Sequence, residues 1–191
     1  MVKPMKQPTQ NKGSISLKEL VFFGVYAALM IAFKELMGVL PNIEPITVMV
    51  IALTCVYGIK ALLPVYVFSI IQIVLHGFHV WNFMYLYVWA VLVFLTLLLL
   101  PIHRLLGKLG GSRSAVLQTA LWTVVAALFG IVFGTLCAIP YFFMLGTAGG
   151  VSWIISGLSF DITHCIANGI ITAAAFYPLY KALNFAKLKL I

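Results

Sequence analysis

The chain has 191 residues, of which 63% are hydrophobic and only 8% are charged. Soluble domains carry about 25% charged residues, so this composition excludes an ordinary water-soluble domain and indicates a protein embedded in lipid. The formal net charge of +8 needs no nucleic acid to explain it, because lysine and arginine gather on the cytoplasmic side of membrane proteins.

Six apolar stretches follow one another along the chain, each near the ~20 residues that a helix needs to cross the hydrocarbon core. We therefore predict an all-α bundle of six transmembrane helices. The expected spans are residues 18–37, 45–60, 62–79, 84–102, 115–140 and 153–181. The polar residues 1–16 lack the apolar core of a signal peptide. They are expected to form a cytoplasmic tail, which leaves residues 17–191 as one transmembrane domain.

The basic residues are distributed unevenly between the two ends of such a bundle. With six spans both termini share a side, and every lysine and arginine except Lys34 falls on that side. By the positive-inside rule both termini are cytoplasmic. We expect a multi-pass protein of the cell membrane, of the kind found in bacterial plasma membranes.

Small residues recur at helical spacing in the first and fifth spans. Gly24, Ala28 and Ala32 stand four residues apart, and such a stripe lets another helix approach closely. Packing within the bundle and docking of a partner helix both explain it. In the fifth span, Gly130 and Gly134 indicate a packing seam rather than a functional site.

The three cysteines, Cys55, Cys137 and Cys165, all fall within the predicted spans. Their odd number and their spacing match neither a disulfide framework nor a metal motif. We therefore expect free, buried thiols, and we expect no metal and no other cofactor.

Polar residues are costly inside a span, so their positions are informative. In the sixth span, Asp161, His164, Asn168 and Thr172 lie on one helical face. A carboxylate at this depth is expected to face the bundle interior or a wet cavity. Asp161, His164 and Asn168 are therefore candidate substrate-binding residues.

Further polar and aromatic side chains gather near the outer ends of the other spans. Convergence of such groups on one side is typical of an outward-facing binding pocket. The candidates are Asn42 and Glu44 in the first outer loop; Gln72, His76 and His79 in the third span, on one face with Ser69; Trp81, Asn82, Tyr85 and Trp89 around the start of the fourth; and Tyr141 and Trp153 beside the third outer loop.

The same residues also suit roles in which no ligand binds. The tyrosines and tryptophans suit an interfacial aromatic belt, and Asp161 and His164, one turn apart, suit a structural ion pair. A membrane scaffold, or a small intramembrane enzyme that uses these two residues, therefore stays open. No G-x-S-x-G turn, H-E-x-x-H motif or P-loop is present, so we expect neither an enzyme nor ATP hydrolysis by this chain.

Three segments carry a resemblance to a known family. They are residues 42–47 (NIEPIT), 81–89 (WNFMYLYVW) and 160–169 (FDITHCIANG), the last followed by Pro178, Leu179 and Tyr180. With six spans and the small-residue stripe, the chain resembles the substrate-binding S components of energy-coupling factor (ECF) transporters. It is most similar to a group that includes proposed cobalamin and queuosine-precursor carriers. The D-x-x-H-x-x-x-N face is the most specific part.

The resemblance implies a function in uptake. An S component of this ABC-type importer binds a vitamin outside the cell and docks onto a membrane coupling subunit, here through Gly24, Ala28 and Ala32. Two cytoplasmic ATPase subunits drive the assembly. The first expectation for the ligand is cobalamin or a corrinoid precursor, and the alternative is a queuosine precursor or another vitamin. The chain begins Met1-Val2-Lys3, which argues against nickel or cobalt ions, since metal-specific members begin with a chelating Met-x-His.

Overall fold

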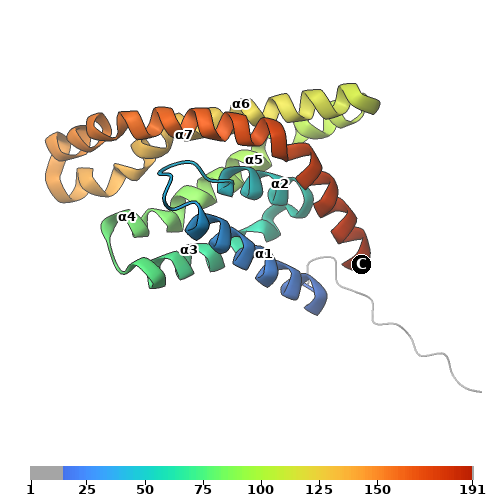
Figure 1. Cartoon of the computed structure of the whole chain (residues 1–191), viewed down its shortest axis with the longest axis horizontal. Helices are drawn as coiled ribbons and strands as arrows, with labels where there is room; N and C mark the ends of the chain where they lie inside the picture. Colours follow the sequence, from blue (N-terminus) through green and yellow to red (C-terminus); the bar gives the residue numbers. More distant parts are fainter. Residues whose placement is uncertain (1–14, 191) are drawn as a thin grey trace, which may run out of the picture.

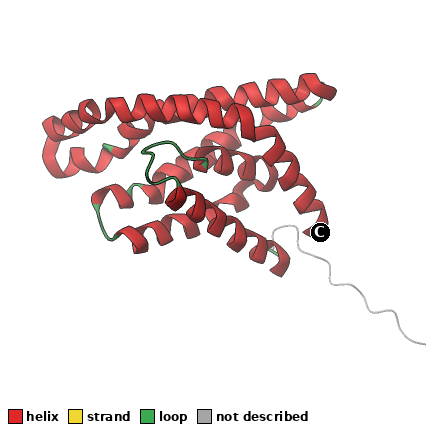
Figure 2. Cartoon of the chain, viewed as in Figure 1, coloured by secondary structure: helices red, strands yellow, loops and turns green. Residues whose placement is uncertain are grey.

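The computed structural model describes residues 15–190, and every regular element in that part of the chain is helical (Figures 1 and 2). The predicted tail therefore lies almost wholly outside the described residues, and so does the side chain of Trp81. The elements are α1 (Leu17–Leu36), α2 (Ile46–Tyr57), η1 (Gly58–Ala61), α3 (Leu62–His76), α4 (Val80–Phe83), α5 (Tyr85–Gly107), α6 (Gly111–Cys137) and α7 (Ile139–Leu190).

The first helix begins where its sequence supplies a capping box. The Ser16 hydroxyl accepts a hydrogen bond from the Glu19 backbone N–H at 3.1 Å, and the Glu19 carboxylate accepts one from the Ser16 N–H at 3.0 Å. These bonds satisfy two donors that the first helical turn otherwise leaves unpaired. Glu19 also binds the ammonium group of Lys60 in η1 at 3.0 Å, which joins the start of α1 to the turn after α2.

The first three predicted breaks between spans fall close to the observed helix ends. Helix α2 ends before Gly58, inside the predicted second span of residues 45–60. Gly58 has a φ of 61°, in the left-handed region that favours glycine. The last two predicted spans correspond to α6 and α7, but α7 starts earlier than the sixth span and ends later. The range Ile139–Leu190 holds two helical segments that meet at a kink at Gly146, which has a φ of 69°.

Helix α2 is the centre of the fold. Every residue from Ile46 to Tyr57 except Cys55 is buried, and α2 packs against α7, α5, α1 and α6. The outward faces of the surrounding helices are strongly apolar, as at Val25 of α1, Val74 of α3 and Ile170 of α7. A soluble monomer rarely exposes apolar surface on this scale, so the exterior is compatible with a membrane-embedded protein.

Four helical stretches of the described chain are long and apolar enough to cross a membrane. They are Ile46–His76, Tyr85–Gly107, Gly111–Cys137 and Ile139–Lys189. The first joins α2, η1 and α3, which the sequence divided into two spans. Helix α1 is not among the four, because charged residues stand near both of its ends: Lys18, Glu19, Lys34 and Glu35.

Lys60 and Lys187 lie at one end of the bundle, and Lys34 lies at the other. The ammonium group of Lys187, near the end of α7, donates to the carbonyl oxygen of Val56 at 2.6 Å, and Lys60 binds Glu19 at the start of α1. Figure 1 shows the start of α1 and the C-terminal end of α7 on the same side of the molecule. Lys34 lies near the other end of α1, where it pairs with Glu44.

The glycine seam predicted in the fifth span joins α6 to α7. A Cβ atom on Gly130 would lie 2.7 Å from the backbone of His164 and Cys165, and one on Gly134 would overlap the carboxylate of Asp161. The two helices approach so closely only because these side chains are absent. The seam also brings the backbone of α6 against the polar face of α7.

Candidate functional site

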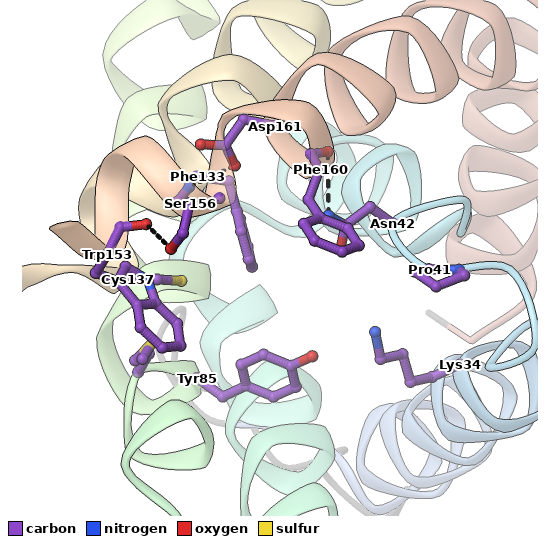
Figure 3. Close-up of a pocket in the computed structure, with 13 residues that line it drawn as sticks. Lys34, Pro41, Asn42, Tyr85, Phe133, Cys137, Trp153, Ser156, Phe160 and Asp161 are labelled. Carbon is purple, nitrogen blue, oxygen red and sulfur yellow. Dashed lines mark hydrogen bonds between the residues drawn. The ribbon is translucent and has the colours of Figure 1, made fainter.

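A cavity of about 430 Å³ lies between the loop after α1, the start of α5, the end of α6 and the middle of α7 (Figure 3). Its volume is in the range of about 300–1,000 Å³ that is typical of small-molecule sites. Its walls are mainly aromatic and small, with two charged residues. The lining residues are Lys34, Pro41, Asn42, Met84, Tyr85, Phe133, Gly134, Cys137, Trp153, Ser156, Gly157, Phe160 and Asp161.

Asp161 provides a carboxylate in the cavity wall. It stands on α7 opposite the glycine seam, with 4% of its surface exposed, and it accepts a hydrogen bond from the backbone N–H of Gly134 at 2.9 Å. Since a carboxylate has about four acceptor positions, this bond leaves most of its acceptor capacity unused. A ligand in the cavity that carries an N–H or O–H group could therefore donate a hydrogen bond to the Asp161 carboxylate.

Lys34 provides a cation in the cavity wall, but its charge is balanced locally. Its ammonium group forms an ion pair with the carboxylate of Glu44, and it lies 5.9 Å from the ring centroid of Tyr85. Glu44 is more deeply buried than Lys34, with 6% against 22% of the side chain exposed. The pair fixes the end of α1 to the start of α2 and presents the Lys34 side of the pair to the cavity.

Aromatic rings form much of the remaining wall. The ring of Trp153 is stacked on Tyr141, with centroids 3.9 Å apart and planes 15° from parallel. Tyr85 packs between Phe68 and Trp89, at 6.0 and 5.8 Å between centroids. These contacts hold the rings in place, so the cavity offers pre-arranged flat faces to a ligand.

The loop after α1 closes one side of the cavity through Asn42. This residue has a φ of 61°, which asparagine tolerates better than most other residues that have a Cβ atom. Its side-chain amide donates to the carbonyl oxygen of Phe160 at 3.1 Å, as Figure 3 shows. The contact joins the first outer loop to α7 beside Asp161.

The structure brings four of the predicted binding residues to this cavity: Asn42, Tyr85, Trp153 and Asp161. Two more support its walls without lining it. Glu44 holds Lys34, and Tyr141 lies behind Trp153.

The third-span stripe does not line the cavity, because it pairs with α1 and α5 instead. Glu35 accepts a hydrogen bond from the Gln72 amide at 3.0 Å and lies 3.0 Å from Nε2 of His76. Ser69 donates to the backbone of Tyr85 at 3.0 Å. His79 is exposed beside the α3–α4 turn. The predicted ligand contacts of Gln72, His76 and His79 remain predictions without support from the cavity.

The remaining candidates are buried outside the cavity. Asn82 donates to the carbonyl oxygen of Gly77 at 2.6 Å, and Asn168 donates to that of Ala126 at 3.3 Å. Trp89 lies in the aromatic core. His164, 1% exposed, packs edge-on against Phe133 at 4.7 Å. Neither of its ring nitrogens has a hydrogen-bond partner in the described chain, which removes the alternative of an Asp161–His164 ion pair.

Sequence reasoning missed the contribution of α6 to the site. Phe133, Gly134 and Cys137 line the cavity, although the segment was interpreted as a packing seam alone. A signal was present, because a glycine seam lets the backbone of one helix approach a carboxylate on the facing helix, as the Gly134 N–H approaches Asp161. Lys34, near the outer end of the first span, was not among the candidate binding residues, yet it lines the cavity. Within residues 15–190, no group of three or more His, Cys, Asp or Glu side chains is arranged to hold a metal ion.

Comparison of the chain with protein-family models, with curated proteins and with solved structures finds no match.

Proposed function

We propose that this protein is the substrate-binding S component of an ECF-type importer, which captures a vitamin or related nutrient outside the cell. The observation that carries the proposal is the cavity around Asp161, Tyr85 and Trp153, set in a bundle with an apolar exterior. Its position near the Lys34 end of α1, away from the end that holds Lys60 and Lys187, suits capture from the outer side.

The proposed topology has six passes with both termini in the cytoplasm. The helices α1, α2, α3, α5, α6 and α7 would supply the passes, with the charged ends of α1 at the two membrane surfaces. Its support is the gathering of basic residues beside the start of α1 and the end of α7, together with the positive-inside rule.

The proposed partners are a membrane coupling subunit and two cytoplasmic ATPase subunits. Gly24, Ala28 and Ala32 are all exposed on α1, and a Cβ atom on Gly24 would meet nothing within 4 Å. The stripe is therefore free of packing within the described bundle. That accessibility favours docking of another helix over the alternative of internal packing.

The proposed ligand is a vitamin, and the two classes that the resemblance implies differ greatly in size. Cobalamin and its corrinoid precursors are large macrocycles with many amide groups. Queuosine precursors are small, flat heterocycles. Aromatic walls and neutral hydrogen-bonding groups suit both classes.

Ligand protection of a native thiol tests the proposed site. Cys137 lines the cavity, whereas Cys55 lies near the other end of α2. In a Cys165→Ala variant in lipid nanodiscs, we expect cyanocobalamin or queuine to slow maleimide modification of Cys137 at least fivefold. Modification of Cys55 is expected to stay unchanged. Equal rates at Cys137 with and without both compounds would contradict the proposal.

Bulky substitutions in the stripe test the docking surface. Ala28→Trp and Ala32→Trp add a large ring where a partner helix would approach closely, so we expect loss of co-purification with the coupling module and of uptake. Binding by the isolated protein should not change. Val124→Trp, at an exposed position of α6, is the matched control. Normal uptake by both stripe variants would show that docking occurs elsewhere.

A further inference from the structure

The longest stretch of the chain without a charged residue contains the turn that follows α6, residues 139–150, which we call the outer turn. Between Arg113 and Asp161 the sequence has no aspartate, glutamate, lysine, arginine or histidine. The first outer loop, by contrast, is bordered by Lys34 and Glu44. Turns that face water are usually rich in polar residues such as asparagine, aspartate and serine. The composition of the outer turn is therefore unlike that of a turn in water.

The two arms of the outer turn pack closely against each other. The kink at Gly146 reverses the chain between two helical segments. A Cβ atom on Gly150 would overlap the ring of Phe142, so the arms meet at this distance only because that position is glycine. The ring of Tyr141 is stacked on Trp153, with centroids 3.9 Å apart. The outer turn therefore presents a defined set of side chains on its outside.

The outward side chains of the outer turn are large and apolar. Phe143 has 87% of its surface exposed, and Met144 and Leu145 have 62% each. Thr147 is the only polar side chain in residues 143–150. Adjacent exposed apolar side chains of this size mark a surface that contacts a partner or a membrane. Something other than water therefore covers the tip of the turn.

The apolar surface of the outer turn is continuous with the exterior of α7. Exposed aliphatic side chains stand three or four residues apart along this helix, which places them on one face. They are Val151, Ile155, Leu158, Ile162, Ile166 and Ile170. The face belongs to a stretch that is long and apolar enough to cross a membrane. Lipid that covers Ile170 therefore extends along the same face to the turn.

The length of α6 indicates the depth of the outer turn in the membrane. The 27 residues of α6 give a helix about 40 Å long, whereas the hydrocarbon core is about 30 Å thick. With Arg113 at one membrane surface, α6 reaches the opposite boundary between hydrocarbon and headgroups. Figure 1 shows the turn at the end of the α6–α7 pair away from the C-terminus. Tyrosine and tryptophan gather at this boundary, as Tyr141 and Trp153 would here.

We propose that the outer turn inserts into the leaflet on the Lys34 side of the bundle, with Phe143, Met144 and Leu145 among the upper parts of the lipid acyl chains. The partner of this surface is lipid. The contact bears on the cavity, because Trp153 both stacks on Tyr141 and lines the cavity wall. The inference goes beyond the proposed carrier function, since it depends on no ligand and on no partner subunit.

Fluorescence quenching from the two sides of the membrane boundary tests the proposal. Phe143→Cys is labelled with the fluorophore NBD in the full chain with Cys165→Ala, in phosphatidylcholine nanodiscs. The protein without the added cysteine gives the background. Ile170→Cys, on the apolar face of α7, and Lys108→Cys, exposed in the turn between α5 and α6, are the lipid and water controls. We expect iodide to quench the label at position 108 at least threefold more strongly than at position 143. Lipid spin-labelled at acyl carbon 5 should quench position 143 at least twofold more strongly than position 108.

Two results would overturn the proposal. Equal iodide quenching at positions 143 and 108 would place the outer turn in water. Protection from iodide without quenching by spin-labelled lipid would show that protein, such as a second copy of the chain, covers the turn.

A measurement without substitution covers the case in which Phe143→Cys does not fold. A photoreactive diazirine confined to the membrane is applied to the unmodified protein in nanodiscs, and the labelled residues are located by mass spectrometry. Residues 142–145 should be labelled within twofold of residues 162–170, which lie on the exposed face of α7. Labelling of residues 162–170 alone would contradict insertion of the turn.

Discussion

Replacing Gly130 with valine is expected to lower the free energy of unfolding by about 3 kcal/mol, near the upper end of the usual cost of overpacking. A Cβ atom at this position would lie 2.7 Å from backbone atoms of His164 and Cys165. Backbone atoms in a helix cannot rotate aside as a side chain does, so α6 and α7 must move apart. The change is measured by thermal or denaturant unfolding in detergent.

The matched control is Gly24→Val on α1, where a new Cβ atom would meet nothing within 4 Å. Glycine and valine are both weaker helix formers than alanine, so this substitution should change stability little. A loss at Gly24 as large as the loss at Gly130 would mean that helix propensity, rather than the seam, explains the effect. Separation of α6 and α7 would also displace Asp161, so ligand binding should fall in Gly130→Val alone.

The second large effect is expected for the Lys34–Glu44 pair. Lys34→Met leaves the carboxylate of Glu44, which is 6% exposed, without its counter-charge. Removal of one partner of a buried pair costs about 3–5 kcal/mol, so we expect a loss of about 3 kcal/mol. Glu44→Gln should cost less, because Lys34 is more exposed and borders the cavity.

A double-mutant cycle separates the pair from its parts. The double variant Lys34→Met/Glu44→Gln removes both charges and should be more stable than Lys34→Met alone, since no unpaired charge remains. Strictly additive losses would show that the two side chains act independently. Each protein is compared by unfolding in the same detergent, with and without added salt.

The helices were predictable from the sequence because the length of an apolar segment and the glycines in it can be read locally. The Gly130–Gly134 seam appears in the structure where the pattern indicated. Asp161 could be placed near a cavity because a carboxylate inside an apolar helix has few tolerable surroundings. Each of these inferences uses residues on one helix.

The rest of the site depended on partners that lie far apart in the chain. Gln72 and His76 share a face of α3, but the pattern does not reveal that Glu35 of α1 accepts their hydrogen bonds. These residues were therefore interpreted as ligand-facing, whereas in the structure they join α3 to Glu35 of α1. The third outer loop, expected between residues 140 and 153, is instead helical on both sides of a kink at Gly146.

Helix α1 contains both Lys34, in the cavity wall, and Ala32, in the exposed stripe. The two residues lie about 3 Å apart along the axis of one rigid helix. A ligand that shifts the backbone of α1 at Lys34 therefore shifts the stripe as well. Binding at two sites of one protein is reciprocal. If a bound ligand changes the affinity of the protein for a partner subunit by some factor, the bound partner changes the affinity for the ligand by the same factor. If the coupling subunit docks on this stripe as proposed, helix α1 links occupancy of the cavity to docking.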